Sequence, residues 1–206
     1  MSLRALTLLH RELDACRACP NMIGPVVHGP PVLSRILLIG QAPGPREGSF
    51  GRPFAWTAGK TLFRWFQEAT GLTEDQFRER IYMAAVARCF PGKSPGGGDR
   101  RPGGDEITRC RRFLEEEVRI LKPRLVIPVG TLAIDETLGK APAQTRKLAD
   151  VVGTSTHIRY HGVEMDAICL PHPSGASTWH RMEPGKSLLA RAMRLIASHA
   201  EVKGLL

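Results

Sequence analysis

The sequence predicts an α/β fold, because short apolar runs alternate along the chain with longer amphipathic segments. Residues 36–39 form an apolar run that ends at Gly40, and residues 125–129 form another that ends at Gly130. Runs of this length are typical of buried parallel strands. The chain has 206 residues, enough for a sizeable core, and we expect a single domain over residues 1–206.

The other elements follow from the same periodicities. Two weaker apolar runs, 83–87 and 167–170, are candidate strands that lead into loops. Thr73 with Gln76 resembles a capping box at the start of a helix. Residues 91–104 contain six glycines and three prolines, so we expect a mobile basic loop there. Helices are predicted over residues 3–14, 60–69, 73–80, 105–121, 131–138 and 186–199.

The charge balance favours a polyanionic partner. Lysine and arginine number 29 against 20 aspartates and glutamates, which gives a net charge of +9. No apolar run approaches the roughly 20 residues that a membrane-spanning helix needs. Residues 1–16 carry charged side chains where a signal peptide has an uninterrupted apolar core, so we expect a cytoplasmic protein with no membrane partner.

Four of the five cysteines have a spacing that suits a metal site. Cys16 and Cys19 form a C-x-x-C pair, and Cys89 and Cys110 follow far downstream. Their thiolates could converge on zinc or on an iron-sulfur cluster, and a C-x-x-C pair without metal is the remaining alternative. Cys169 lies in an apolar stretch, where a buried thiol is expected.

Two segments that follow predicted strands have the composition of ligand-binding loops. In open α/β sheets, ligands collect at the carboxyl ends of the strands. The first segment begins with residues 40–44, Gly-Gln-Ala-Pro-Gly, and continues through Glu47 to Phe54. The second holds His172 between two prolines. Glycine and proline can fix a loop so that backbone N–H groups point at a ligand, and an aromatic ring can stack on a planar base.

Common nucleotide-binding and hydrolase motifs are missing. The Gly-Lys-Thr or Gly-Lys-Ser runs at 59–61, 92–94 and 185–187 lack the earlier glycine of a Walker A loop, which excludes a P-loop. Residues 40–44 do not fit G-x-G-x-x-G, and there is no G-x-S-x-G or H-E-x-x-H.

The ordered motifs resemble the uracil-DNA glycosylase superfamily, most of all the branch that holds a four-iron, four-sulfur cluster. The resemblance covers roughly residues 16–196. It implies a three-layer α/β/α sandwich around a mainly parallel four-stranded sheet, in a monomer. It also implies that a 4Fe-4S cluster is bound by Cys16, Cys19, Cys89 and Cys110. The motifs that carry the resemblance are Cys16-x-x-Cys19, residues 40–44, Gly51-Arg52-Pro53-Phe54 with Ala58-Gly59, residues 82–89, Cys110 and His172-Pro173-Ser174.

The same resemblance implies a DNA glycosylase that hydrolyses the N-glycosidic bond of uracil or a related deaminated base. Such enzymes take the base out of the stack before they act on it. Phe54 would stack on the extruded base, His172 would contact its O2 atom, and Ser174 would contact the DNA backbone. The residues implied to hold the base and deoxyribose are Gly40, Gln41 and Ala42.

Departures from the family pattern leave the chemistry open. Ala42 stands where the best-known branch has a water-orienting aspartate, and Ala85 stands where the iron-sulfur branch has a uracil-reading asparagine. Gln41 replaces a common glutamate. Glu47 is the only acid in the first motif loop and is therefore the candidate for handling water.

Arg181 and Lys186 are candidate phosphate contacts of the DNA. Two alternatives to the glycosylase interpretation remain. The first is a nucleic-acid-binding relative that recognises a flipped base but cleaves the glycosidic bond weakly or not at all. The second is a zinc-stabilised α/β binding module.

Overall fold

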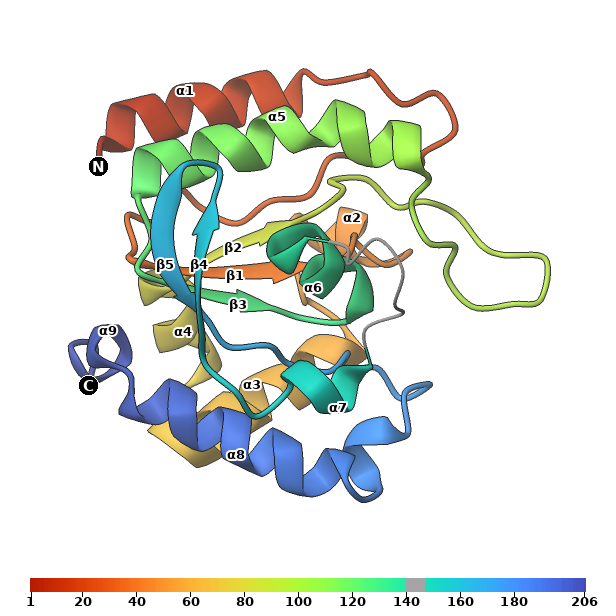
Figure 1. The fold of residues 1–206 in the computed structure, drawn as a ribbon. Coiled ribbons are helices and arrows are strands. Elements are labelled where there is room, and N and C mark those ends of the chain that lie inside the picture. The colour runs from red at the N-terminus through yellow and green to blue at the C-terminus, as the bar shows by residue number, and fades with distance from the viewer. Residues whose placement is uncertain (140–146) are drawn as a thin grey trace.

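A computed structural model describes residues 1–139 and 147–206 (Figure 1). None of the helices in this part is long and apolar enough to cross a membrane. In chain order the elements are α1 (Leu3–Asp14), β1 (Ile36–Gly40), α2 (Glu47–Phe50), α3 (Thr57–Thr70), α4 (Glu74–Arg80), β2 (Tyr82–Ala85), α5 (Gly104–Leu121), β3 (Leu125–Pro128), α6 (Thr131–Leu138), α7 (Leu148–Val151), β4 (Thr156–Tyr160), β5 (Val163–Ala167), the 3-10 helix η1 (Trp179–Arg181), α8 (Gly185–Ser198) and α9 (Ala200–Lys203).

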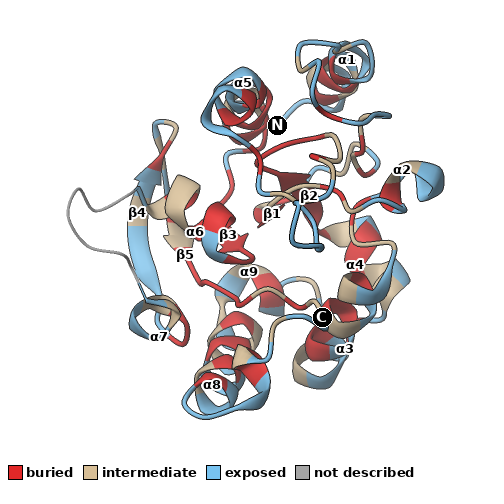
Figure 2. Ribbon diagram, turned by 90° about the vertical axis from the view of Figure 1, so that its right-hand side faces the viewer, coloured by how far each residue is buried: buried red, intermediate tan, exposed pale blue. Residues whose placement is uncertain are grey.

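A five-stranded sheet of order β2-β1-β3-β5-β4 forms the middle layer. Helices α1 and α5 cover one face, and α3, α4 and α8 cover the other (Figures 1 and 2). Successive residues of a strand point to opposite faces. Leu37 and Ile39 therefore pack in the core under α1 and α5, whereas Ile36 and Leu38 pack in the core with α3 and α8. Burial on both faces explains why the sequence of β1 is continuously apolar.

The predicted α/β class is confirmed, but the sheet has five strands where four were expected. The four neighbouring strands β2, β1, β3 and β5 are parallel, and β4 adds an antiparallel edge to β5. Strand β4 was missed because Thr156, His157 and Arg159 are exposed, so no apolar run marks this edge strand.

The fourth parallel strand begins earlier than predicted. Strand β5 spans Val163–Ala167, whereas the apolar run predicted residues 167–170. The pairing with β3 nevertheless continues beyond β5, since the Leu170 amide donates to the Pro128 carbonyl at 2.9 Å. Predicted helix 60–69 is also longer and begins at Thr57. The capping box is confirmed, because Gln76 N–H donates to Thr73 Oγ1 and Thr73 N–H donates to Gln76 Oε1.

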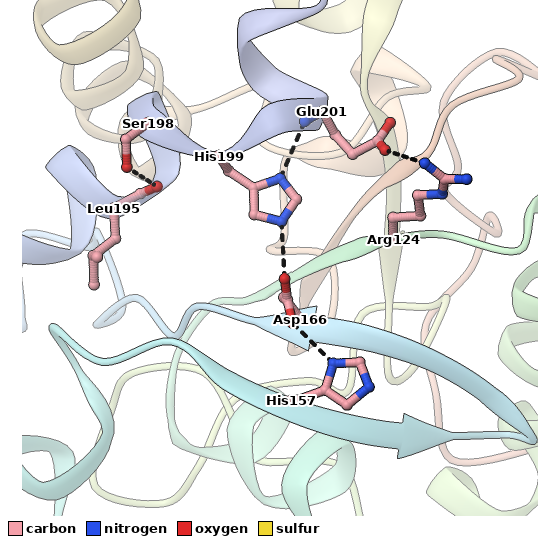
Figure 3. Close-up of polar contacts among 7 residues, drawn as sticks. All are labelled: Arg124, His157, Asp166, Leu195, Ser198, His199 and Glu201. Atoms are coloured by element: carbon pink, nitrogen blue, oxygen red, sulfur yellow. Dashed lines mark hydrogen bonds and ion pairs between the residues drawn. The ribbon is translucent and has the colours of Figure 1, made fainter.

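Two histidines share one carboxylate at the sheet edge (Figure 3). His157 Nδ1 of β4 lies 3.0 Å from Asp166 Oδ1 of β5, and His199 Nε2 lies 3.2 Å from Asp166 Oδ2. The bond to Asp166 raises the pKa of His157 above its usual value, and the bond to His157 is the main cause that lowers the pKa of Asp166. The carboxylate therefore links the sheet edge to the junction between α8 and α9.

We expect this contact to stabilise the fold over a bounded pH range. His157 has a raised pKa when folded, so its contribution is complete below its unfolded pKa and is lost as pH rises through the folded value. Asp166 has a lowered pKa, so its contribution is lost as pH falls through the folded value. Asp166→Asn should reduce the free energy of unfolding more at about pH 5 than at about pH 9. Urea unfolding of wild type, Asp166→Asn and the exposed control Glu12→Gln measures this difference, and a pH-independent effect of Asp166→Asn would contradict it.

Candidate functional site

A small cavity of about 30 Å³ lies where the carboxyl ends of β1 and β2 meet the loop after β5. Its walls come from segments far apart in the sequence. The structure therefore brings together the residues that the sequence predicted to hold and act on a base, namely Gly40, Gln41, Ala42, Glu47, Phe54 and His172. The other lining residues are Val27, Pro43, Pro53, Met83, Ala84 and Ala85.

The first motif loop is fixed by the strand beside it. Val86 N–H donates to the Gly40 carbonyl and Ala87 N–H donates to the Gln41 carbonyl, both at 3.0 Å. Gly40 also lets an aromatic ring approach, because a Cβ at this position would lie 3.0 Å from Cζ of Phe54. The loop and the ring thus form two closely packed walls of the cavity.

Phe54 is held in an unfavourable backbone conformation. Its φ of 54° lies in the left-handed region, which costs energy for a residue with a side chain. Arg78 of α4 opposes this cost by donating from Nη1 to the Pro53 carbonyl at 2.9 Å and from Nη2 to the Phe54 carbonyl at 3.1 Å. Gly59 of α3 leaves space for the Phe54 carbonyl, since a Cβ there would lie 1.7 Å from its oxygen.

Glu47 joins the two loops of the cavity. Its Oε2 accepts from Gly44 N–H at 2.9 Å, and its Oε1 accepts from Ala55 N–H at 3.0 Å. Burial raises the pKa of this carboxyl, although the backbone donors and the charge of Arg78 oppose the rise. A carboxylate has about four acceptor sites, and the backbone donors at Gly44, Ala55 and Phe54 do not fill all of them. Glu47 therefore positions the loops and can still accept a hydrogen bond from water.

His172 lines the cavity from the second loop. Ser174 N–H donates to its Nδ1 at 3.3 Å, so the proton of a neutral ring lies on Nε2. Burial lowers the pKa of His172, while the negative charge of Asp99 opposes this. Gly130 leaves room for the ring, because a Cβ there would lie 3.1 Å from Cδ2 of His172. A neutral Nε2–H donor at neutral pH follows from these contacts.

Asp99 and Arg78 are site residues that the sequence did not reveal. Asp99 belongs to the 91–104 loop, and its Oδ2 lies 3.8 Å from where a Cβ of Gly44 would be. Arg78 lies on α4, and the packing of this helix places its guanidinium at the Pro53 carbonyl. Neither residue belongs to a recognisable motif, so only the folded chain identifies them.

The predicted phosphate contacts are not all at the cavity. Ser174 is half-buried beside His172. Arg181 is exposed in η1, and Lys186 lies on the groove between α3 and α8. Trp179, which comes before both residues, packs against the core. Its carbonyl oxygen also lies against α8, because a Cβ on Gly185 would be 2.0 Å from that oxygen. Trp179 therefore anchors η1 to α8.

The four motif cysteines line a second cavity of about 300 Å³. Cys16 follows the end of α1, and Cys110 is buried in α5. An antiparallel bridge brings the remaining two together, because Ile23 N–H donates to the Phe90 carbonyl at 2.7 Å and Phe90 N–H donates back at 3.0 Å. The thiols that the sequence separates by up to 94 positions (Cys16 to Cys110) thus surround one space.

The chemistry of this cavity fits a thiolate-bound cluster. Burial raises the pKa of Cys89 to about 11, and the charges of Cys110, Cys16 and Cys19 add to the rise. The four sulfurs are therefore within electrostatic reach of one another, and a bound cation would relieve their repulsion. In the described residues, no group of three or more His, Cys, Asp or Glu is arranged to hold a single metal ion. Ala42 packs against the same buried cluster, Met22, Ala87 and Cys110, as Cys19 and Cys89 do, so the first motif loop lies close to the cysteines.

The three-layer fold and the cavity at its strand ends define the class of protein. A family model of the uracil DNA glycosylase superfamily matches residues 26–195. The chain therefore belongs to this superfamily. Cys89 and Cys110 lie within the matched residues, and Cys16 and Cys19 lie before them.

Several curated proteins are similar to this chain. A type-4 uracil-DNA glycosylase of Sulfurisphaera tokodaii is 29% identical over 143 residues, which cover 69% of this chain and 61% of that protein. A type-4 uracil-DNA glycosylase of Pyrobaculum aerophilum is 27% identical over 172 residues, covering 82% and 83% respectively. A type-5 uracil-DNA glycosylase of the same organism is 25% identical over 143 residues, covering 62% and 61%. The match thus spans less than two thirds of two of these relatives.

Proposed function

We propose that this protein is a DNA glycosylase that hydrolyses the N-glycosidic bond of uracil or a related deaminated base in DNA, the first step of base-excision repair. The observation that carries the proposal is the cavity that joins Phe54, the Gln41 loop and the neutral His172. The similarity to uracil-DNA glycosylases of types 4 and 5 supports it.

The cavity provides the contacts that an extruded base requires. The Phe54 ring offers a stacking surface, and loop residues Gly40, Gln41 and Ala42 line the cavity with it. As the glycosidic bond breaks, negative charge collects on O2 of the leaving base. A fixed donor at that oxygen stabilises the transition state. We assign this role to Nε2–H of His172, which Ser174 N–H fixes in the required tautomer.

We propose that Glu47 orients the attacking water, because it is the one acid among the residues that line the cavity. Its raised pKa predicts that kcat/KM falls on the acid side at a higher pH than an ordinary glutamate would give. Glu47→Gln should lose this acid limb and about 100-fold in rate. Single-turnover rates from pH 4 to 9 test this, with Glu12→Gln as the exposed control. An unchanged pH profile in Glu47→Gln would leave Glu47 a positioning role only.

DNA is the proposed partner, and the net charge of +9 supports a polyanion. Ser174, Arg181 and Lys186 are the proposed backbone contacts. Ser174 is next to the cavity, so its contact would be made close to the extruded nucleotide. Arg181 and Lys186 lie on η1 and α8, where they would meet phosphates farther along the strand.

The proposed reaction is tested with labelled oligonucleotides that carry one uracil, hypoxanthine or xanthine. Each is offered single-stranded and opposite each normal base, and alkali then cuts the abasic sites. We expect cleavage at uracil or at another of these deaminated bases. Protein that cleaves none of them under any condition would contradict the glycosylase proposal.

A second candidate is a base-binding relative without efficient chemistry. The observation that favours it is that Ala42 and Ala85 line the cavity at the positions where the family resemblance leads one to expect aspartate and asparagine. Such a protein would bind an oligonucleotide with an unpaired uracil and leave the glycosidic bond intact. Gel-shift and cleavage assays on the same oligonucleotide separate the two candidates.

We propose that Cys16, Cys19, Cys89 and Cys110 hold a 4Fe-4S cluster. The convergence of four thiols on one cavity supports this ligand set. When bound, the cluster would cross-link α1, the segment after β2 and α5. Zinc is the alternative occupant, and its presence would favour the structural module over the iron-sulfur branch.

Cluster ligation predicts a specific loss of colour. Anaerobically purified protein should be brown, with broad absorbance near about 400 nm and bound iron and sulfide. Cys89→Ser or Cys110→Ser should abolish the colour, whereas Cys169→Ala, which removes a buried thiol elsewhere, should retain it. A colourless wild type that contains zinc would overturn the cluster, and colour that persists in Cys110→Ser would overturn the ligand set.

A further inference from the structure

Arg88 is a buried cation in the wall of the cysteine cavity. Only 1% of the residue is exposed, and it lines the same cavity as the four thiols. Its Nε donates to the Ala85 carbonyl at 2.9 Å, and its Nη2 forms an ion pair with Oε2 of Glu117. Its Nη1 is buried and has no hydrogen-bond partner among the described residues. An unpaired donor on a buried charge is unfavourable, so this atom calls for an acceptor.

A buried network holds the guanidinium in place. Glu117 of α5 is completely buried and also accepts from the Tyr82 hydroxyl at 2.7 Å. That hydroxyl lies 2.8 Å from His10 Nε2 of α1. Three elements, α1, β2 and α5, thus fix the carboxylate and, through it, Arg88. A network of this kind leaves the guanidinium little freedom to turn away from the cavity.

The Tyr82 hydroxyl near Arg88 is already engaged with Glu117 and His10, and the four thiols are the side-chain acceptors that line the cavity. Arg88 directly precedes Cys89, and Cys110 lies close enough for the positive charge of Arg88 to act on its thiol. Thiolate and cluster sulfurs accept hydrogen bonds, and such bonds together with nearby positive charge raise the reduction potential of an iron-sulfur centre. The negative charge of Glu117 partly offsets the positive charge of Arg88, but Glu117 pairs with Nη2 and not with Nη1.

We propose that Arg88 is a positioning residue for the cluster, which donates from Nη1 to its sulfur ligands and raises its reduction potential. This inference rests on the cluster proposed above. Glu117 holds the guanidinium in the donating orientation. The measured step is the addition of one electron from an external reductant to the cluster, in which no covalent bond forms or breaks.

The test is the midpoint potential of the anaerobic holoprotein, measured by dye-mediated titration with dithionite. Arg88→Met alone would leave the negative charge of Glu117 buried without an opposing charge, so the informative variant is Arg88→Met with Glu117→Gln, which removes both charges. At the wild-type midpoint, the ratio of reduced to oxidised cluster should fall at least tenfold, about 59 mV for one electron. Glu117→Gln alone leaves the positive charge unopposed and should raise the ratio.

Opposite shifts of the two variants separate an electrostatic role from a packing role, which would move both in the same direction. Arg109→Met removes an exposed cation next to Cys110 and should leave the ratio within about twofold, because water screens its charge. An unchanged or raised ratio in the double variant would overturn the proposal.

If the double variant loses its iron, its midpoint potential cannot be measured. Arg88→Lys, which retains the positive charge, then tests the proposal. The proposal is supported if Arg88→Lys keeps its iron and its ratio of reduced to oxidised cluster stays within about threefold of wild type. It is overturned if Arg88→Lys loses as much iron as the double variant. Wild-type protein that holds zinc or no metal would instead contradict the proposed cluster, before any variant is compared. None of these measurements depends on base excision.

Discussion

His172→Ala should reduce the single-turnover rate of base excision by about 100-fold to 1000-fold, because it removes the donor proposed for O2 of the leaving base. The neutral ring already presents Nε2–H, since Ser174 N–H occupies Nδ1. No step that protonates His172 is needed, and burial keeps its pKa low. The rate of wild type should therefore show no loss as pH rises through 6.5, the ordinary pKa of histidine.

The matched control is His157→Ala, which removes an exposed histidine from β4, far along the sheet from the cavity. It should retain the wild-type rate at saturating DNA. Thermal unfolding of both variants shows whether a rate loss reflects folding. A His172→Ala enzyme within about threefold of wild type would mean that another donor stabilises the leaving base, since an ordinary oxyanion donor contributes far more.

Part of the fold and of the site could be predicted because the signal was local. Residues 36–40 are buried on both faces, so the strand is a continuous apolar run. Phe54 and His172 follow strands inside loops whose glycines and prolines mark them. By contrast, three of the five residues of the edge strand β4 are exposed and only Tyr160 is buried, so no apolar run marks it.

Other residues of the site depend on contacts between distant segments. Arg78 supports the Phe54 backbone from 24 positions away, and Glu117 holds Arg88 from 29 positions away. An arginine on a helix has the same sequence signal whether it faces water or a carbonyl. Glu47 shows the same limit, because the sequence placed it in the loop but not between the amides of Gly44 and Ala55.

Gly59→Ala should abolish most of the activity, although Gly59 itself does not line the cavity. The added Cβ would lie 1.7 Å from the carbonyl oxygen of Phe54, a backbone atom that cannot turn aside as a flexible side chain can. Either α3 or the Phe54 segment must shift, and overpacking of this kind costs roughly 1–3 kcal/mol of stability.

The Phe54 segment should move first, because its backbone is already in the left-handed region and depends on two bonds from Arg78. Displacing the stacking ring by about 1 Å is enough to cost on the order of 100-fold in rate. Gly29→Ala is the matched control, since a Cβ at Gly29 meets no atom within 4 Å. Excision rates and unfolding curves of both variants make the comparison, and a Gly59→Ala protein with wild-type activity would show that the Phe54 backbone tolerates another conformation. The strain at Phe54 would then be incidental to base binding, and the role of Arg78 would reduce to packing of α4.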